Sequence, residues 1–417
     1  MQRSLFSAVT GLRNHQVKMD VLGNNIANVN TIAFKGSRVR FQDILNQNIR
    51  GASAPQFGRG GINPAQVGLG MSIGAIDTIH TQGNLQSTGR ATDLAIQGNG
   101  FFVMSDGVGR SFTRDGAFSV GADGDLANAA NGFKPLGWAA DASGAISTTA
   151  PLGPLNIPIG QTVTSATTSL NFAGNLDAAA ASGATHLAEV LVYDSQGGLH
   201  TVEVTFTKTG PNAWSWTAHW VQPATPPATG LTRTAAGSGG TLAFDASGNT
   251  LPPPSPPAPI FFTPTGGAAA LSIVPDFDRL TQVVGLNNAL VRFQDGFPVG
   301  ELESFTIGRT GIISGVFTNG LLRDMGQLAL ANFPNAEGLL KGSANMFQVS
   351  SNSGQPRIGA AGQEGRGTIE TATLEMSNVD LSAEFTEMIT TSRAFQANSR
   401  VITSSDELLQ EVVNLKR

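Results

Sequence analysis

Two heptad repeats stand at opposite ends of this 417-residue chain, and they constrain its fold more than any other feature. Apolar residues recur every seven positions near the N-terminus, and the same spacing returns near the C-terminus, in a stretch (368–417) without Gly or Pro. A seven-residue repeat is typical of helices that pair along an apolar seam. The seam residues are Leu5, Leu12, Met19 and Ile26 in the first segment and Leu381, Met388, Phe395, Ile402 and Leu409 in the second.

The two repeats predict terminal helices over residues 1–28 and 378–417 that pair as a coiled coil. In the first helix His15 interrupts the second seam position, while Phe385 and Val413 widen the stripe of the second. A repeat alone leaves open whether the partner helix belongs to the same chain or to another copy. Since both apolar stripes need cover, we expect the two termini to meet.

Between the repeats the chain has the pattern of an all-β protein. Short apolar runs are separated by dipeptides typical of tight turns. These dipeptides are Asp106-Gly107, Asp115-Gly116, Asp123-Gly124, Asn131-Gly132, Asp295-Gly296 and Asn319-Gly320. The predicted fold class is therefore mainly β with terminal α-helices.

Residues 145–283 differ from their flanks and are interpreted as an inserted outer β domain. They hold 15 of the 21 prolines, and their 3 basic and 7 acidic residues give a charge of 3 − 7 = −4. Alternating apolar runs and three Trp residues indicate a β core of their own. The predicted domains are nested. A terminal helical domain (1–28 and 378–417) encloses a connecting segment (29–75 and 366–377), an inner β domain (76–144 and 284–365) and the outer domain.

Composition excludes several classes of function. With 25 basic and 30 acidic residues the chain has no excess of positive charge for nucleic acid, and without Cys it has neither disulfides nor thiolate chemistry. The five His residues are scattered, so we expect no metal site and no cofactor. Gly70-Met71-Ser72-Ile73-Gly74 matches a nucleophile-elbow pattern, but it lacks the strand–turn–helix context, and a Gly-rich loop explains it better.

The N-terminal segment contains no signal-peptide core, and no apolar run is long enough to span a membrane. Taken alone, this observation favours a cytoplasmic protein without membrane insertion.

Five short blocks resemble the flagellar axial proteins that build the rod and the hook. The most specific lies within residues 22–36, where Asn28, Thr31, Phe34 and Lys35 fall on the Ala-Asn-x-x-Thr and aromatic-Lys pattern of that family. The remaining blocks begin at Asp93, Phe112, Leu328 and Ser377. Ala33 stands where the family often has Gly, so we expect a less permissive backbone there.

The resemblance implies a structural subunit rather than an enzyme. Length and the inserted domain favour the hook, a curved flexible tube that transmits motor torque to the filament as a universal joint. A distal-rod subunit is the alternative. The implied partners are other copies of the chain, the distal rod, the hook-filament junction protein, the hook cap and the type III export apparatus.

The implied location is extracellular, in the hook and basal body, after export without a cleaved signal peptide. Some hook proteins cross-link through Cys and Lys, a reaction closed to this chain because it has no Cys. Two alternatives come from other classes. A secreted Ser hydrolase using Ser72 would be distinguished by Ser72→Ala, and a β-rich surface adhesin leaves the paired heptads unexplained.

Overall fold

The computed structural model describes residues 2–55, 57–141, 143–223, 231–252, 257–264 and 266–414. Met1 and residues 415–417 of the predicted helices, and the prolines among residues 253–256, lie outside the described residues. The chain divides into two compact units. Unit 1 comprises Met1–Ile157, Thr306–Ser314 and Asp324–Arg417, and unit 2 comprises Pro158–Phe305 and Gly315–Arg323.

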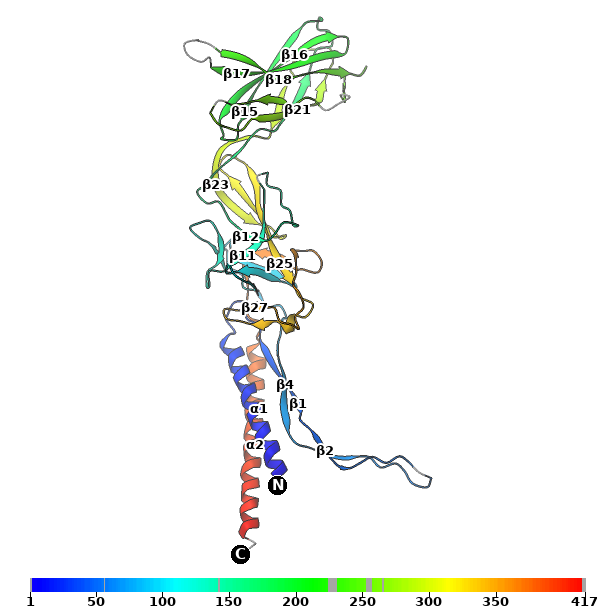
Figure 1. The fold of residues 1–417 in the computed structure, drawn as a ribbon, viewed down its shortest axis with the longest axis vertical. Coiled ribbons are helices and arrows are strands. Elements are labelled where there is room, and N and C mark those ends of the chain that lie inside the picture. Colours follow the sequence, from blue (N-terminus) through cyan, green and yellow to red (C-terminus); the bar gives the residue numbers. More distant parts are fainter. Residues whose placement is uncertain are drawn as a thin grey trace. The chain divides into compact units, whose positions relative to one another are not determined.

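Both chain ends are helical, and the rest of the described chain is built mainly of strands, which confirms the predicted fold class (Figure 1). The N-terminal helix α1 spans Gln2–Ala27, and the C-terminal helix α2 spans Leu381–Asn414. Asp380 caps α2, because its Oδ1 accepts a hydrogen bond of 2.8 Å from the Ser382 amide. The helices pack against each other in unit 1.

A long hairpin follows α1. Strand β1 (Ser37–Asp43) pairs antiparallel with β4 (Met71–Thr78), and both contact α1. Further along the hairpin, β2 (Asn46–Arg50) pairs with β3 (Ala65–Gly68). We call residues 44–70 the arm. Its described residues between 44 and 64 are all exposed, so nothing in the described chain covers them.

Unit 1 surrounds an apolar core that includes Phe101, Phe112, Trp138 and Phe347. Its central strand β7 (Phe101–Ser105) pairs with β8, β11 and β25. The N-terminal strands are β5 (Leu85–Ser87), β6 (Leu94–Gln97), β7, β8 (Arg110–Thr113), β9 (Phe118–Val120), β10 (Leu126–Asn128), β11 (Lys134–Ala139) and β12 (Gly153–Pro154). The C-terminal strands are β25 (Leu322–Asn332), β26 (Leu340–Lys341), β27 (Met346–Gln348), β28 (Arg357–Ala360), β29 (Thr368–Thr371) and β30 (Thr373–Glu375). A short 3-10 helix spans Ala336–Gly338.

Unit 2 contains a five-stranded antiparallel sheet and a four-stranded sheet. Their shared core includes Phe172, Phe206, Trp214, Trp216 and Phe277. The larger sheet runs β15 (Thr185–Tyr193), β16 (Leu199–Gly210), β17 (Ala213–Pro223), β18 (Leu231–Phe244) and β19 (Thr250–Leu251). The smaller runs β20 (Ile260–Phe262), β21 (Leu271–Thr281), β14 (Ser169–Asn175) and β22 (Leu290–Gln294). Strand β13 (Thr162–Ser165) pairs with β23 (Phe297–Ile307), which β24 (Ile312–Phe317) follows in the chain.

The limits of unit 2 differ from those of the predicted outer domain. Unit 2 continues past residue 283 through β22, which pairs with β14, and reaches Phe305 in β23, which pairs with β13, although nothing in the composition marks this continuation. It starts later than residue 145 because β12 pairs with β11 of unit 1. We call β1 and β4 the root of the arm; the predicted connecting segment 29–75 contains the arm, β1 and the first part of β4.

Candidate assembly site

The helix pair is antiparallel. Asn25 near the end of α1 hydrogen-bonds Glu384 in the first turns of α2, and Lys18 pairs with Glu387 at 2.6 Å. Near the middle of α1, Gly11 faces Asn398, and a Cβ added to Gly11 would lie 2.8 Å from the Asn398 amide nitrogen. Gly11 therefore allows the close approach of the two helices.

The predicted seam residues of α2 divide into two groups. Met388, Phe395, Ile402 and Leu409 are partly buried, whereas Leu381 is 39% exposed at the start of the helix. In α1 the predicted residues Leu5, Leu12, Met19 and Ile26 are also partly buried, flanking a more deeply buried row of Ala8, Gly11, Leu22 and Asn25. Eight of the nine predicted seam residues are thus partly buried, and their role in pairing the two helices stays a prediction.

The second seam position of α2 is polar, and the apolar pattern alone gave no indication of it. It holds Glu384, Thr391, Asn398 and Ser405, again seven residues apart. The buried Thr391 and Ser405 hydroxyls donate to carbonyls one turn earlier, at 2.7 Å each. Burial raises the pKa of Glu384. The sequence signal for this row is the same seven-residue spacing applied to small polar residues.

A second apolar face of the helices remains uncovered. The widening residues Phe385 and Val413 belong to this face and not to the seam, being 50% and 69% exposed. Ile389 is 61% exposed and Phe6 on α1 is 66% exposed. Exposed apolar surface of this extent marks an interaction surface.

The family-motif residues lie in the segment that connects the end of α1 to β1. The Asn28 side chain donates to the Asn24 carbonyl and accepts a bond from the Thr31 hydroxyl, which closes the turn. Ala33 has φ 57°, a left-handed conformation that favours Gly, and it is fully buried. The Phe34 ring is buried beneath the Lys341 ammonium, 3.9 Å from the ring centre.

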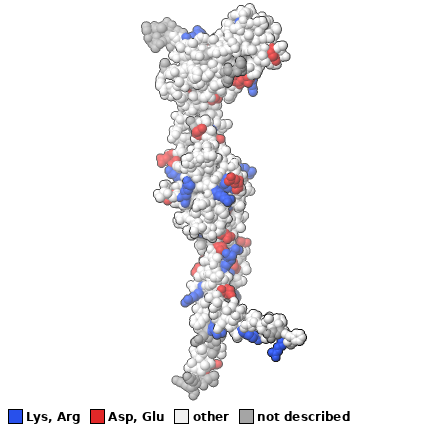
Figure 2. Space-filling view, turned by 45° about the vertical axis from the view of Figure 1, so that its right-hand side comes forward, with Lys and Arg blue, Asp and Glu red and all other residues white. Residues whose placement is uncertain are grey.

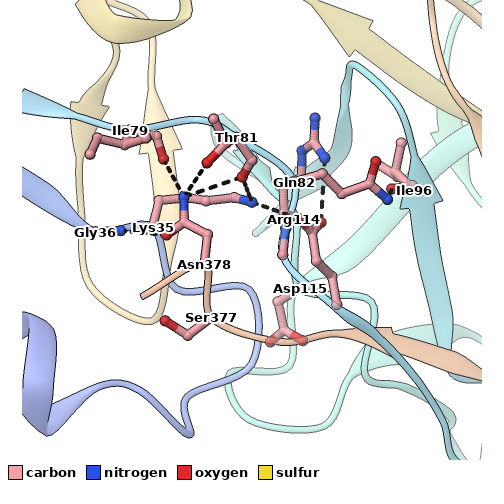
Figure 3. A network of polar contacts seen from close by, with 12 residues as sticks. Lys35, Gly36, Ile79, Thr81, Gln82, Ile96, Arg114, Asp115, Ser377 and Asn378 are labelled. Carbon is pink, nitrogen blue, oxygen red and sulfur yellow. Dashed lines mark hydrogen bonds and ion pairs between the residues drawn. The ribbon is translucent and has the colours of Figure 1, made fainter. Parts of the chain in front are cut away.

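Lys35 is buried in an ion-pair network with Glu375 and Arg114. Figure 3 shows Lys35 and Arg114 within this network. Its Nζ lies 2.6 Å from Glu375 Oε1 and donates at 2.7 Å to the carbonyl of Thr81. Arg114 lies 3.3 Å from the other carboxylate oxygen. Burial lowers the pKa of Lys35, an effect that the carboxylate of Glu375 partly offsets.

This network ties together three distant parts of the sequence. Lys35 follows α1, Arg114 follows β8, and Glu375 ends β30 just before α2. The Gly83 amide also donates to Glu375 at 2.9 Å, and a Cβ on Gly83 would lie 2.0 Å from the Met376 carbonyl. The ends of both helices are thereby anchored to the β core of unit 1.

A cavity of about 710 Å³ opens beside this network, with His80 in its wall. The His80 ring packs edge-on against Phe101 and Phe347. Burial, together with the nearby charges of Lys35 and Arg114, lowers the pKa of His80 to about 4.

Ser72 does not sit in a nucleophile elbow. The loop expected at Gly70–Gly74 is wrong, because residues from Met71 onward form β4, with Ser72 paired to Gln42 of β1. Among the described residues, no group of three or more His, Asp or Glu side chains could hold a metal ion.

No α-helix within the described ranges combines the length and apolar character needed to cross a membrane.

Four family profiles match the chain. They are the flagella basal body rod protein (residues 5–35), the flagellar hook protein FlgE/F/G D1 domain (95–171), the flagellar basal body protein FlaE D2 domain (161–297) and the flagellar basal body rod FlgEFG protein C-terminal region (370–415).

Full-length relatives carry the same assignment. The chain is 42% identical to the flagellar hook protein FlgE of Borreliella burgdorferi and 41% identical to that of Treponema pallidum, with 100% of both chains covered in each case. It is 31% identical to the flagellar basal-body rod protein FlgG of Bacillus subtilis, again over 100% of both chains.

A crystal structure of the Helicobacter pylori flagellar hook protein FlgE2 shares the fold. It has a TM-score of 0.51 at 16% identity and covers 70% of this chain and 100% of its own. The nested strands between two terminal helices and the motif around Lys35 point to the same family as the full-length identities. The chain belongs to the flagellar hook protein family.

Proposed function

We propose that this protein is the structural subunit of a bacterial flagellar hook, which polymerises into a curved flexible tube and transmits motor torque to the filament. The observation that carries the proposal is full-length 42% identity to a hook protein, combined with terminal helices that expose an apolar face. Its partners are other copies of itself, with the distal rod, the hook-filament junction protein and the hook cap at the ends of the tube. It leaves the cell through the type III export apparatus without a cleaved signal peptide.

Two surfaces support contact between copies. The first is the outer face of the helix pair with Phe385, Ile389 and Val413. The second is the arm, which exposes Ile49 and Phe57 and carries two Arg residues but no Asp or Glu. The face in Figure 2 shows these basic side chains on an otherwise uncharged arm. An isolated two-stranded hairpin is marginal in water, so a neighbouring copy is the natural cover for it.

The terminal helices are expected to order only on assembly. Isolated helices are marginal unless their apolar faces are packed, and here one face stays exposed even in the helix pair. Folding of the ends is then coupled to polymerisation, and the helices line the inner channel of the tube.

Electron microscopy of the purified protein, concentrated under salting-out conditions, tests the proposal. The intact chain is expected to give curved tubes, whereas a variant truncated after Asn378 gives none. Ile389→Ser removes exposed apolar surface and is expected to raise the concentration needed for polymerisation at least tenfold. Gln396→Ser, at an exposed polar position of the same helix, is the matched control.

Straight tubes would favour the distal rod, the alternative that the 31% identity to a rod protein keeps in view. Particles that never polymerise would reopen the adhesin and hydrolase readings.

A further inference from the structure

Two asparagines, the buried Asn25 and the partly buried Asn378, come from the two terminal helix regions and hold the same dipeptide. Asn25, in the last turns of α1, accepts a 3.0 Å hydrogen bond from the Ser37 amide and donates at 2.8 Å to the Ser37 carbonyl. Asn378, just before α2, accepts a 2.9 Å bond from the Gly36 amide (Figure 3). Gly36 and Ser37, at the start of β1, are therefore held by residues from both terminal regions of the chain.

The same side chains reach further. The Asn378 amide donates to the Ile79 carbonyl at 2.8 Å and to the Thr81 hydroxyl at 2.9 Å, where the chain leaves β4. The Asn25 amide also donates to Glu384 of α2 at 3.1 Å. Asn25 is 1% exposed. Both strands at the root of the arm and both helices thus share one hydrogen-bonded joint.

Other contacts make the root of the arm depend on α1. Asn14 donates at 2.6 Å to the Met71 carbonyl, and the Met71 amide donates at 3.4 Å to the Thr10 hydroxyl. The His15 ring lies edge-on to Phe41, with ring centres 5.5 Å apart. Without α1, β1 and β4 would lose the surface that covers one of their faces.

We propose that Asn25 and Asn378 are positioning residues. They couple the pairing of α1 and α2 to the packing of the β1–β4 hairpin against α1, so that the helices and the arm become ordered in one step. The inference rests on the proposed function, because that step is the addition of a copy to the polymer. Asn25 is buried, and a buried polar group left without its partner is costly, so its bonds to Ser37 and Glu384 form together or not at all. The arm is then presented to a neighbour only from a subunit whose helices are already paired.

Hydrogen exchange measured by mass spectrometry on the free protein and on assembled tubes tests the coupling. In the free protein we expect fast exchange in both the helices and β1–β4, while the five-stranded sheet of unit 2 stays protected and serves as an internal reference. In tubes of Asn25→Ala or Asn378→Ala, exchange at residues 36–43 and 71–78 is expected to rise about tenfold, together with exchange in the first turns of α2. The control Gln16→Ala, at an exposed position of α1, should match the unchanged chain.

The double variant gives the sharpest readout. Since both side chains hold one dipeptide, its effect is expected to fall short of the product of the single effects. A free protein with a protected β1–β4 hairpin beside rapidly exchanging helices would overturn the coupling, as would variant tubes with unchanged exchange at residues 36–43. Failure of the unchanged chain to polymerise would instead count against the proposed function and is seen before any variant is made.

Discussion

Glu375→Gln tests whether the buried ion pairs hold the helix ends to unit 1. Glu375 and Lys35 are fully buried, and Arg114 is 4% exposed. Removal of the carboxylate charge leaves two buried cations facing a neutral amide. Loss of one partner of a buried ion pair typically costs about 3–5 kcal/mol, because the remaining charge stays desolvated.

Glu370→Gln is a matched control in the neighbouring strand. Glu370 pairs with Arg309 at 2.8 Å, but the Arg309 side chain is 75% exposed. Exposed ion pairs contribute about 0–1 kcal/mol, so the control should lose little. The two substitutions make the same chemical change and differ mainly in burial.

Urea unfolding followed by hydrogen exchange and mass spectrometry separates the two units. Peptides from residues 94–104 report on unit 1, and peptides from residues 202–220 report on unit 2. We expect Glu375→Gln to lower the free energy of unfolding for unit 1 alone. The difference in unfolding free energy between the variant and the unchanged chain should shrink as the pH rises toward 10. Burial lowers the pKa of Lys35, so the folded variant can lose this proton while the unfolded chain still holds it, and its stability then rises with pH.

A loss below about 1 kcal/mol, or equal losses for Glu375→Gln and Glu370→Gln, would refute this reasoning. A deficit that grows with pH would show that Lys35 is not the uncompensated charge.

Three further predictions concern single residues of unit 1. The pKa of His80 is lowered from 6.5 to about 4, so the unfolded chain takes up a proton at this residue before the folded chain does. The free energy of unfolding should therefore fall by up to about 3 kcal/mol as the pH drops from 6.5 to 4. Urea titrations at several pH values should show a flatter dependence for His80→Phe. Gly83→Ala places a Cβ 2.0 Å from the Met376 carbonyl and should destabilise unit 1 by about 2–3 kcal/mol, whereas Gly153→Ala, with open space around its Cβ, should leave its unfolding midpoint nearly unchanged. Ser72→Ala should leave polymerisation unchanged by electron microscopy, and a loss of any hydrolytic activity in this variant would revive the enzyme reading.

The sequence predicted the architecture well where a pattern repeats. The heptads predicted two terminal helices, and the turn dipeptides predicted β structure between them. Of the six dipeptides, four have a Gly with positive φ: Gly107, Gly124, Gly132 and Gly320. The other two serve close approach instead, since a Cβ on Gly116 would lie 1.8 Å from the Leu94 carbonyl and one on Gly296 would lie 2.1 Å from the Thr167 hydroxyl.

The joint and the ion-pair network could not be predicted in the same way. The family pattern marks Lys35, but its partners Arg114 and Glu375 are separated from it by 79 and 340 residues, and no periodicity connects them. The polar row of α2 gives no core signal in the sequence, because polar residues in a helix are typical of a solvent-facing side. Asn25 and Asn378 lie in two of the blocks that resemble the axial proteins, but only tertiary contacts show that they bond the same dipeptide.

The chain passes from unit 1 into unit 2 and back within its β region, while both chain ends belong to the helix pair of unit 1. A gene with this plan can lengthen, shorten or exchange its middle in a single recombination event and still encode the same two termini. Variation in the outer part of such proteins therefore carries little risk for the part that every copy shares.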